Sequence, residues 1–483
     1  MKVYMLNPPY YPHFGRGMRW QDVGRGGTLY YPLWLAYATA VVEEEYKMKL
    51  VDAPAWNWSK KDVIEDVKRI KPDLIVMDSS FPSLNNDLSV AEIIKENCSD
   101  AKITLVGPPA SQLPEKILES NGIDIVARGE YDFTIKEIAE TIEKEGSFEN
   151  IKGISYKDNG KMIRNLDKKF TDSEDLDKIP FVSKVYKKHL RVEDYFLGTS
   201  LYPEVQIFAG RGCPFKCTFC SWPQTLMGRK YRIRSIQNIL DELEWIQENL
   251  PQVKEVFLDD DTFTVNGRYI RAFCDEFKKR KLNVVWSCNV RVGLDYETMK
   301  KMKDANCRLL IVGYESGSDT ILKNVKKGIT VKDSKQFARD AKKAGLLVLG
   351  DFVVGLPGEN KETIEATKRL IREVKPELLQ VAPATPFPGT EFYEWCKENG
   401  YLLTDEPNEY LDNQGHQKSV ISYPGLSNHE IVQAVDEMLK GHYLSLRYIP
   451  LAMRQIFRRH GLDELKRFLY SARIFIRYIL NRR

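Results

Sequence analysis

The residues best suited to chemistry are three cysteines with the spacing C-x3-C-x2-C, namely Cys213, Cys217 and Cys220. Gly210 and Gly212 stand just before them and let the backbone wrap closely around a bound group. Three thiolates on one short loop can ligate three irons of a 4Fe–4S cluster and leave the fourth iron open to an outside ligand. Clustered cysteines in an intracellular chain indicate metal or redox chemistry rather than disulfides.

Two alternatives are three structural cysteines and a zinc site. A structural zinc ion usually has four protein ligands, and no fourth ligand lies nearby in the sequence, so we favour the cluster. The chain has eight cysteines, and the other five are scattered. Cys288 lies near the end of an expected strand, but we favour a packing role for it. The remaining four are expected in core or helix positions: Cys98, Cys274, Cys307 and Cys396.

The elements that must position these residues are two series of apolar runs separated by amphipathic stretches, which predict an α/β fold. The first series predicts a doubly wound, flavodoxin-like layer, with strands near 3–8, 50–53, 74–79, 103–107 and 123–127. A hairpin with an Asn159-Gly160 turn should follow it. The second series predicts a partial (β/α)6 barrel that binds ligands at the carboxyl ends of its strands, with strands near 205–209, 255–258, 284–288, 309–314, 346–354 and 378–382.

These patterns divide the 483 residues into four segments. The flavodoxin-like layer should span 1–145 and the hairpin with a linker 146–200. The partial barrel should span 201–400 and a basic helical region 401–483.

The cysteine motif, with Phe219 before its last cysteine and at the first strand end of a βα series, resembles that of the radical S-adenosylmethionine (SAM) superfamily. The resemblance covers about 205–400. It implies that SAM binds the open iron and that its reductive cleavage yields a 5′-deoxyadenosyl radical. It also implies SAM contacts at the strand ends, from Asp259, Asp261, Asn289, Arg291, Glu315, Gly355 and Pro383. No residue is assigned a catalytic role.

The first 145 residues resemble the cobalamin-binding domain that precedes many radical SAM enzymes. Small and hydroxyl residues after three strands would let a corrin approach the backbone. The expected contacts are Ser79, Ser80, Ser83, Leu84, Gly107, Gly129 and Glu130. The segment that starts at Asp52 lacks the His and Gly of a D-x-H-x-x-G motif, so we expect cobalamin without a histidine lower ligand. The alternative is a layer that has lost cobalamin and serves as a scaffold for the substrate.

The segment 16–32 contains three arginines, four glycines and several aromatic residues. It is long for a βα loop, and long loops are often functional. We expect it to contact the substrate or the cofactor, with arginines that could hold a phosphate or a carboxylate.

The net charge of +4 hides an uneven distribution, because residues 440–483 carry +9 and the rest of the chain carries −5. The overall balance favours no nucleic-acid partner. No apolar run reaches about 18 residues and the N-terminus turns polar early, so we expect a cytoplasmic protein. The basic amphipathic stretch 469–480 leaves two alternatives. It could make a peripheral contact with the inner face of a membrane, or pack on the barrel with its arginines outward.

Taken together, the resemblance implies a cobalamin-dependent radical SAM enzyme that transfers a methyl group to an unactivated carbon. Its cofactors would be a 4Fe–4S cluster, SAM and cobalamin. Its partners would be a small-molecule or lipid substrate and an external electron donor such as ferredoxin or flavodoxin. One alternative is cyclisation or carbon-skeleton rearrangement of a lipid or natural product. Another is a non-catalytic iron–sulfur redox protein.

Overall fold

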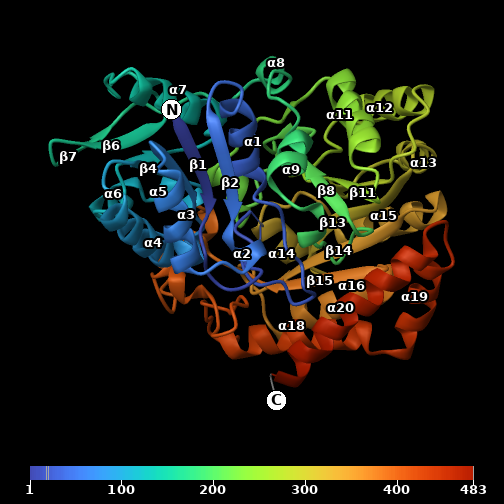
Figure 1. Cartoon of the computed structure of the whole chain (residues 1–483). Helices are drawn as coiled ribbons and strands as arrows, with labels where there is room; N and C mark the ends of the chain where they lie inside the picture. The colour runs from blue at the N-terminus through green and yellow to red at the C-terminus, as the bar shows by residue number, and fades with distance from the viewer. Residues whose placement is uncertain (18, 20, 482–483) are drawn as a thin grey trace. The chain divides into compact units, whose positions relative to one another are not determined.

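The computed structural model describes residues 1–17, 19 and 21–481, and the chain forms two compact units (Figure 1). Unit 1 comprises Met1–Phe196, Ser221–Gly228 and Glu406–His416. Unit 2 comprises Leu197–Cys220, Arg229–Asp405 and Gln417–Arg483. The four-segment division made from the sequence stays a prediction, and nearly all of its hairpin-and-linker segment belongs to unit 1.

Unit 1 contains a sheet with the strand order β2-β1-β3-β4-β5-β6-β7. The first five strands are parallel, and their order is the flavodoxin-like one, as predicted. The last two form the predicted hairpin and extend the sheet in an antiparallel sense. The strands are β1 (Lys2–Asn7), β2 (Lys47–Asp52), β3 (Leu74–Asp78), β4 (Lys102–Val106), β5 (Ile125–Ala127), β6 (Ile154–Asp158) and β7 (Lys161–Arg164).

The central strands of unit 1 are apolar because both faces of the sheet are covered. Every residue of β3 is buried, and its Ile75 and Met77 belong to one core cluster with Leu105 of β4. Helix boundaries follow local capping signals: Ser59 and Asp62 form a reciprocal capping box at the start of α3. The main helices are α1 (Leu33–Val42), α3 (Lys60–Ile70), α4 (Leu84–Asn97), α5 (Pro108–Gln112), α6 (Pro114–Glu119), α7 (Asp132–Glu143) and α9 (Val182–His189).

Unit 2 contains a six-stranded parallel sheet with the order β15-β14-β13-β12-β11-β8. Each successive strand is added at the same edge, which is the winding of a (β/α) barrel and confirms the predicted partial barrel. The strands are β8 (Glu204–Ile207), β11 (Glu255–Leu258), β12 (Trp286–Val290), β13 (Cys307–Glu315), β14 (Leu347–Val354) and β15 (Leu378–Pro383).

The barrel helices begin at recognisable caps, such as Thr330 with Asp333 for α15 and Asn360 with Thr363 for α16. A small antiparallel pair, β9 (Gly210–Arg211) and β10 (Arg232–Ile233), flanks the cysteine loop. The barrel helices are α11 (Ile236–Asn249), α12 (Gly267–Lys279), α13 (Tyr296–Asp304), α14 (Asp319–Asn324), α15 (Val331–Ala344), α16 (Lys361–Val374) and α17 (Glu391–Glu398).

The C-terminal region is helical, as predicted, with α18 (Asn428–Tyr443), α19 (Ile449–Ile456) and α20 (Gly461–Asn481). Arg308, at the start of β13, pairs with Glu464 of α20 at 2.7 Å and with Glu255 at the start of β11 at 2.6 Å. The amino ends of the barrel strands are therefore tied to the C-terminal helices. Within the described residues, no helix is long and apolar enough to cross a membrane.

Candidate functional site

The cysteine loop follows β8 and β9 and is held by backbone hydrogen bonds from two other elements of unit 2. The Thr218 N–H donates to the carbonyl of Val325, directly after α14, at 3.1 Å. The Phe392 N–H, at the start of α17, donates to the carbonyl of Thr218 at 3.1 Å. Cys217 directly precedes Thr218 and is buried, while Cys213 and Cys220 are half-buried. The loop is thus positioned at the carboxyl ends of the barrel strands by the fold itself.

Cationic side chains lie near these thiols. The Lys327 Nζ is 2.6 Å from the Glu315 Oε1, and the two side chains form a buried ion pair at the end of β13. Burial acts to lower the pKa of Lys327, but the Glu315 carboxylate and the Cys217 thiol outweigh it, so the pKa is raised and the charge is kept. The Arg291 guanidinium lies 3.8 Å from the centroid of the Phe215 ring, inside the loop.

The donor set fits a 4Fe–4S cluster. None of the three cysteines forms a disulfide, and one iron per thiolate is the arrangement such a cluster requires. Burial, reinforced by Asp261, raises the pKa of the Cys213 thiol to about 11, so that thiol is neutral until a metal displaces its proton. Lys327 and Arg291 would offset part of the negative charge of the thiolate-bound cluster. Among the described residues, no group of three or more His, Cys, Asp or Glu side chains surrounds a single metal ion.

Several residues predicted to contact SAM surround this loop. Asp261 and Glu315 lie close to it, as their effects on Cys213 and Lys327 show. Asn289 donates to the Asp259 carboxylate at 3.1 Å, which joins the ends of β11 and β12. These contacts bring strand ends together as expected, while their role in SAM binding stays a prediction.

Gly355 directly follows β14, and Pro383 ends β15, where it pairs in register with Val354, the residue before Gly355. The Glu359 carboxylate accepts hydrogen bonds from the Gly355 N–H at 2.5 Å and the Leu356 N–H at 3.2 Å. Burial raises the pKa of Glu359 to about 7. The Tyr423 hydroxyl donates to the Gly355 carbonyl at 2.6 Å. The loop after β14 is therefore held by hydrogen bonds from Glu359 and Tyr423 to its backbone.

Sequence reasoning missed Lys327, which stands in a Lys-Lys-Gly run after α14. Nothing in that run distinguishes Lys327 from its exposed neighbour Lys326, because the ion pair with Glu315 arises from the fold. Gly313 explains part of the geometry: an added Cβ would lie 2.2 Å from the Glu315 Oε1 and 2.8 Å from the Lys327 Nζ. A larger residue at position 313 would therefore push the ends of these two side chains aside.

Cys288 is fully buried, and the Cys307 thiol lies near it. Burial raises its pKa well above the usual range, and the neighbouring thiol adds to this effect. The neighbouring Asn289 is half-exposed and reaches Asp259. Since successive side chains of a strand point to opposite faces, Cys288 points away from that polar edge, which supports the packing role.

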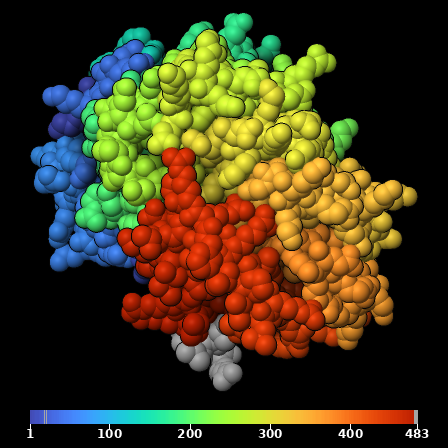
Figure 2. All heavy atoms as spheres, turned by 90° about the vertical axis from the view of Figure 1, so that its right-hand side faces the viewer, coloured from blue at the N-terminus to red at the C-terminus, as the bar shows by residue number. Residues whose placement is uncertain are grey.

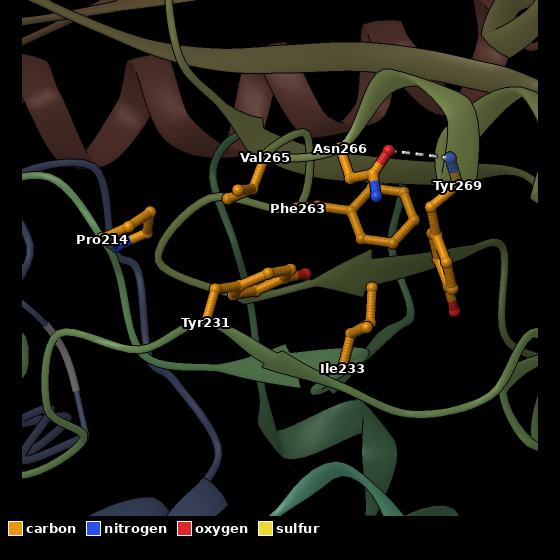
Figure 3. Close-up of a pocket in the computed structure, with 7 residues that line it drawn as sticks. All are labelled: Pro214, Tyr231, Ile233, Phe263, Val265, Asn266 and Tyr269. Atoms are coloured by element: carbon orange, nitrogen blue, oxygen red, sulfur yellow. Dashed lines mark hydrogen bonds between the residues drawn. The ribbon is translucent and has the colours of Figure 1, made fainter.

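A pocket of about 320 Å³ opens beside the cysteine loop (Figure 3). Pro214, directly after Cys213, forms one wall, and aromatic rings from β11–α12 and from the segment before β10 form the others. The Tyr231 hydroxyl donates to the Asp260 carboxylate at 2.7 Å, which fixes that ring. The pocket is lined by Pro214, Tyr231, Ile233, Phe263, Val265, Asn266 and Tyr269.

In unit 1, the carboxyl edge of the sheet carries a buried network centred on Asp87. Its carboxylate pairs with the Arg16 guanidinium at 2.6 Å and accepts hydrogen bonds from the hydroxyls of Ser79 at 2.9 Å and Ser83 at 2.6 Å. The Ser80 hydroxyl lies 2.7 Å from that of Ser83. All these side chains are buried. The three serines predicted to contact cobalamin are therefore hydrogen-bonded within the protein.

Arg16 belongs to the segment 16–32, whose arginines were expected to hold a ligand. Its guanidinium instead donates to Asn7, to the Pro8 carbonyl, to Ser83 and to Asp87. For Arg16 that expectation is wrong, because its hydrogen bonds join β1 to the start of α4. Arg19 of the same segment lies over the Trp222 ring, 4.3 Å from its centroid.

The other predicted cobalamin contacts also lie at this edge. Gly107 has φ +101°, and an added Cβ would lie 2.2 Å from the Ser79 carbonyl oxygen. The glycine is therefore needed because the backbone of Ser79 packs closely against it. The Gly129 N–H donates to Ser111 at 2.8 Å, and Glu130 accepts from the Thr171 N–H at 2.9 Å. Leu84 begins α4.

The chemistry of this edge fits a large, partly polar cofactor. Burial raises the pKa of Asp52 to about 6 and that of Asp78 to about 7, so the edge is desolvated although it is polar. An added Cβ at Gly129 would meet nothing nearer than a Phe170 carbon at 3.9 Å, which leaves its backbone approachable. The switch in strand order between β1 and β3 lies at the same edge, where open α/β sheets bind ligands.

Comparisons with known proteins match a family model to each of the two regions, the cysteine loop of unit 2 and the sheet of unit 1. The Radical SAM superfamily model matches residues 207–371, and the B12 binding domain model matches residues 22–139. A methyltransferase of Pyrococcus horikoshii, itself uncharacterized, is 30% identical over 438 residues, which cover 90% of this chain and 92% of the relative. The chain belongs to the cobalamin-binding radical SAM family. Its cofactors are therefore a 4Fe–4S cluster, SAM and cobalamin.

Two further likenesses bear on fold and reaction. The anaerobic magnesium-protoporphyrin IX monomethyl ester cyclase of Rubrivivax gelatinosus is 28% identical over 375 residues, or 75% of this chain and 66% of the relative. The structure of the radical SAM methyltransferase TsrM from Kitasatospora setae, with cobalamin and the cluster bound, superposes with a TM-score of 0.69. The two sequences are 16% identical, and the superposition covers 98% of this chain and 99% of the TsrM chain. That likeness supports the fold of both units.

Proposed function

We propose that this radical SAM enzyme transfers a methyl group to an unactivated carbon of its substrate. The observation that carries the proposal is the presence of two sites in one chain. One is a cysteine loop among polar strand ends, and the other is a flavodoxin-order sheet of the cobalamin-binding type. The relative that spans nearly the whole chain bears the name of a methyltransferase. When bound, the cluster and SAM supply a radical, and cobalamin supplies the methyl group.

The chain's own residues hold and orient these groups. Cys213, Cys217 and Cys220 would hold the cluster, and the backbone bonds of Thr218 would keep their loop in place. Lys327 would orient the Glu315 side chain at the end of β13, where Glu315 can accept a hydrogen bond from the SAM amino group.

A second candidate reaction is radical cyclisation or carbon-skeleton rearrangement. The likeness to the Rubrivivax gelatinosus cyclase favours it, because that relative matches three quarters of this chain. Both reactions need the same cluster and the same SAM site. The two differ in product mass, since methyl transfer adds a CH₂ unit that derives from SAM.

We further propose three partners. A ferredoxin or flavodoxin would deliver the electron, and the substrate would be a small molecule or a lipid. In the cytoplasm, the enzyme would make a peripheral contact with the inner face of a membrane. The basic C-terminal region supports this contact, since anionic lipids attract clustered arginines and lysines.

Anaerobic reconstitution tests the cluster. We expect about four irons per chain and formation of 5′-deoxyadenosine under reducing conditions. Both should be lost in a Cys213→Ala/Cys217→Ala/Cys220→Ala variant and kept in Cys98→Ala, which changes a cysteine of unit 1. A cluster that persists in the triple variant would contradict the assignment.

The reaction is tested with SAM that carries a deuterated methyl group. Metabolites and lipids of a deletion strain, compared with wild type, supply candidate substrates. Methyl transfer predicts a product that carries label from SAM. An unlabelled product of altered skeleton would replace the proposal by the second reaction. Absence of SAM cleavage with an intact cluster would favour a redox protein.

A further inference from the structure

The last two helices of unit 2 present one face to the barrel. Arg467 of α20 pairs with Glu464 at 3.0 Å, and Glu464 pairs with Arg308 at the start of β13. Gln455 of α19 donates to the carbonyl of Glu377, just before β15, at 3.1 Å. These contacts place α19 and α20 across the amino ends of the strands, while the cysteine loop lies at their carboxyl ends.

The opposite face of the two helices, here termed the outer face, is apolar and exposed. On α19 and its flanking residues, four side chains recur every three or four residues, which places them on one side of a helix. They are Leu446, Ile449, Met453 and Phe457, with exposed fractions of 84%, 54%, 46% and 76%. On α20, three recur every seven residues: Leu462, Leu469 and Ile476, at 77%, 59% and 49%.

An outer face of this kind needs an explanation, because contiguous exposed apolar side chains usually mark an interaction surface. The two helices contact each other, and both expose apolar side chains on the side away from the barrel. Figure 2 shows the C-terminal segment, in red, at the surface of unit 2 beside the orange and yellow parts of the barrel.

The charges on the outer face have one sign. Arg447, Lys466, Arg473 and Arg477 are exposed. In the part of the chain that the structure describes, none of these four pairs with a carboxylate. Residues 440–483 contain two acidic residues, Asp463 and Glu464, and Glu464 is buried against arginines. Positive charge and exposed apolar surface therefore occur together.

We infer that the outer face docks on the surface of an anionic phospholipid bilayer. Apolar side chains would enter the boundary between headgroups and acyl chains, and the basic side chains would contact the anionic headgroups. An interfacial helix needs no span of the bilayer, in keeping with the finding that no described helix could cross one. Docking by this face would leave the carboxyl ends of the strands free, because they lie at the other end of the barrel.

Vesicle flotation with the full-length protein tests the inference without measuring activity. Vesicles of phosphatidylcholine alone are compared with vesicles that contain one quarter phosphatidylglycerol. We expect at least about tenfold stronger binding to the anionic vesicles, and loss of that advantage at high salt, since basic residues near such a surface contribute additively. The inference rests on the membrane contact proposed above but not on the proposed reaction, so the reaction and the docking can each fail alone.

Two variants separate charge from apolar contact. Lys466→Glu/Arg473→Glu/Arg477→Glu and Leu469→Ser/Ile476→Ser should each weaken binding at least about tenfold. The matched control reverses three exposed lysines elsewhere on unit 2, Lys278, Lys300 and Lys332, to Glu, and should bind like wild type. Circular dichroism should be unchanged in all three variants.

Three outcomes would overturn the inference. The first is absence of wild-type binding to anionic vesicles. The second is equal loss of binding in the control and in the outer-face charge variant, which would show an unspecific charge effect. The third is a wild-type dimer that dissociates in Leu469→Ser/Ile476→Ser while vesicle binding is unchanged, which would assign the face to a second copy of the chain.

Discussion

At the scale of single residues, the buried carboxylates of unit 1 make its stability depend on pH. Burial, opposed by Arg16 and reinforced by Asp87, raises the pKa of Asp78 to about 7 from an ordinary value of 3.8. The folded state thus holds a proton that the unfolded state has released. The stabilisation by this group is complete below about pH 4 and is lost as the pH rises to about 7.

Asp78→Asn tests this at the residue scale. The asparagine keeps an oxygen that can accept from the Ser79 N–H, as the Asp78 Oδ1 does at 3.0 Å, but it cannot ionise. Relative to Asp78→Asn, wild type should lose about 2 kcal/mol of unfolding free energy between pH 5 and pH 8. Urea unfolding of the cofactor-free protein at both pH values measures this. The exposed Asp100→Asn should show no such difference, and a pH-independent gap for Asp78→Asn would contradict the raised pKa.

Gly313 offers a second residue-scale test. A Cβ at this position would displace the Glu315–Lys327 ion pair without removing either charge. If Glu315 contacts SAM, Gly313→Ala should weaken SAM binding by about tenfold or more, since a lost charged hydrogen bond costs roughly 1.4 kcal/mol or more. Equilibrium dialysis with the reconstituted enzyme measures it. Gly441→Ala is the control, because its Cβ would meet nothing within 4 Å; unchanged affinity in Gly313→Ala would exclude the contact.

At the scale of elements, one carboxylate ties α20 to the barrel. Glu464 is buried between Arg308 and Arg467. Burial alone would raise its pKa, but the two guanidiniums outweigh that effect and lower it. Its stabilisation is therefore present above the ordinary pKa of a glutamate and is lost as the pH falls through the lowered value.

Glu464→Gln should leave two buried arginines without their shared carboxylate. We expect a loss of about 3 kcal/mol in unfolding free energy at neutral pH. Increased protease cleavage within α20 should accompany it, as the helix separates from the strand ends. Asp463→Asn, one residue earlier on the same helix, should leave both measurements unchanged. Equal effects of the two variants would show that helix charge alone, and not the tie to β13, stabilises α20.

At the scale of the whole molecule, the chain passes between its two units directly after the cysteine loop. Cys220 is the last residue of one unit 2 segment, and Ser221–Gly228 belong to unit 1. In that short stretch Trp222 is buried and meets the Trp34 ring edge-on, with 6.0 Å between centroids. The eight residues that directly follow the cysteine loop therefore belong to unit 1, and their Trp222 packs in its core.

Trp222→Ala should destabilise unit 1 by about 3 kcal/mol through loss of packing. Corrinoid retention during gel filtration should fall, while the iron content after reconstitution should stay near wild type because the cysteine loop belongs to unit 2. Trp222→Phe should restore most of the corrinoid retention. A parallel loss of iron and corrinoid in Trp222→Ala would indicate that the two units unfold together.

Much of the fold was predictable from local patterns. Short, apolar, β-branched runs and Ser or Thr caps act within a few residues, so they predicted both sheets, the hairpin and the helical tail. The cysteine loop was predictable because its ligands are adjacent in sequence. The Glu315–Lys327 pair was not, since twelve residues and a helix separate its members. Nor was the role of Arg16, whose partner Asp87 lies 71 residues away.

The sequence by itself indicated the 4Fe–4S cluster, because three spaced thiolates on a glycine-rich loop need few other residues to hold one. It also determined the charge of the tail, which follows from composition alone. The tertiary structure decided which polar side chains serve ligands and which serve the protein. The serines and Arg16 of unit 1 are bonded to one another, and Lys327 is paired with Glu315. It also decided that the tail has two faces, one bonded to the amino ends of the barrel strands and one exposed. Such assignments depend on contacts between distant segments, which composition and spacing do not specify.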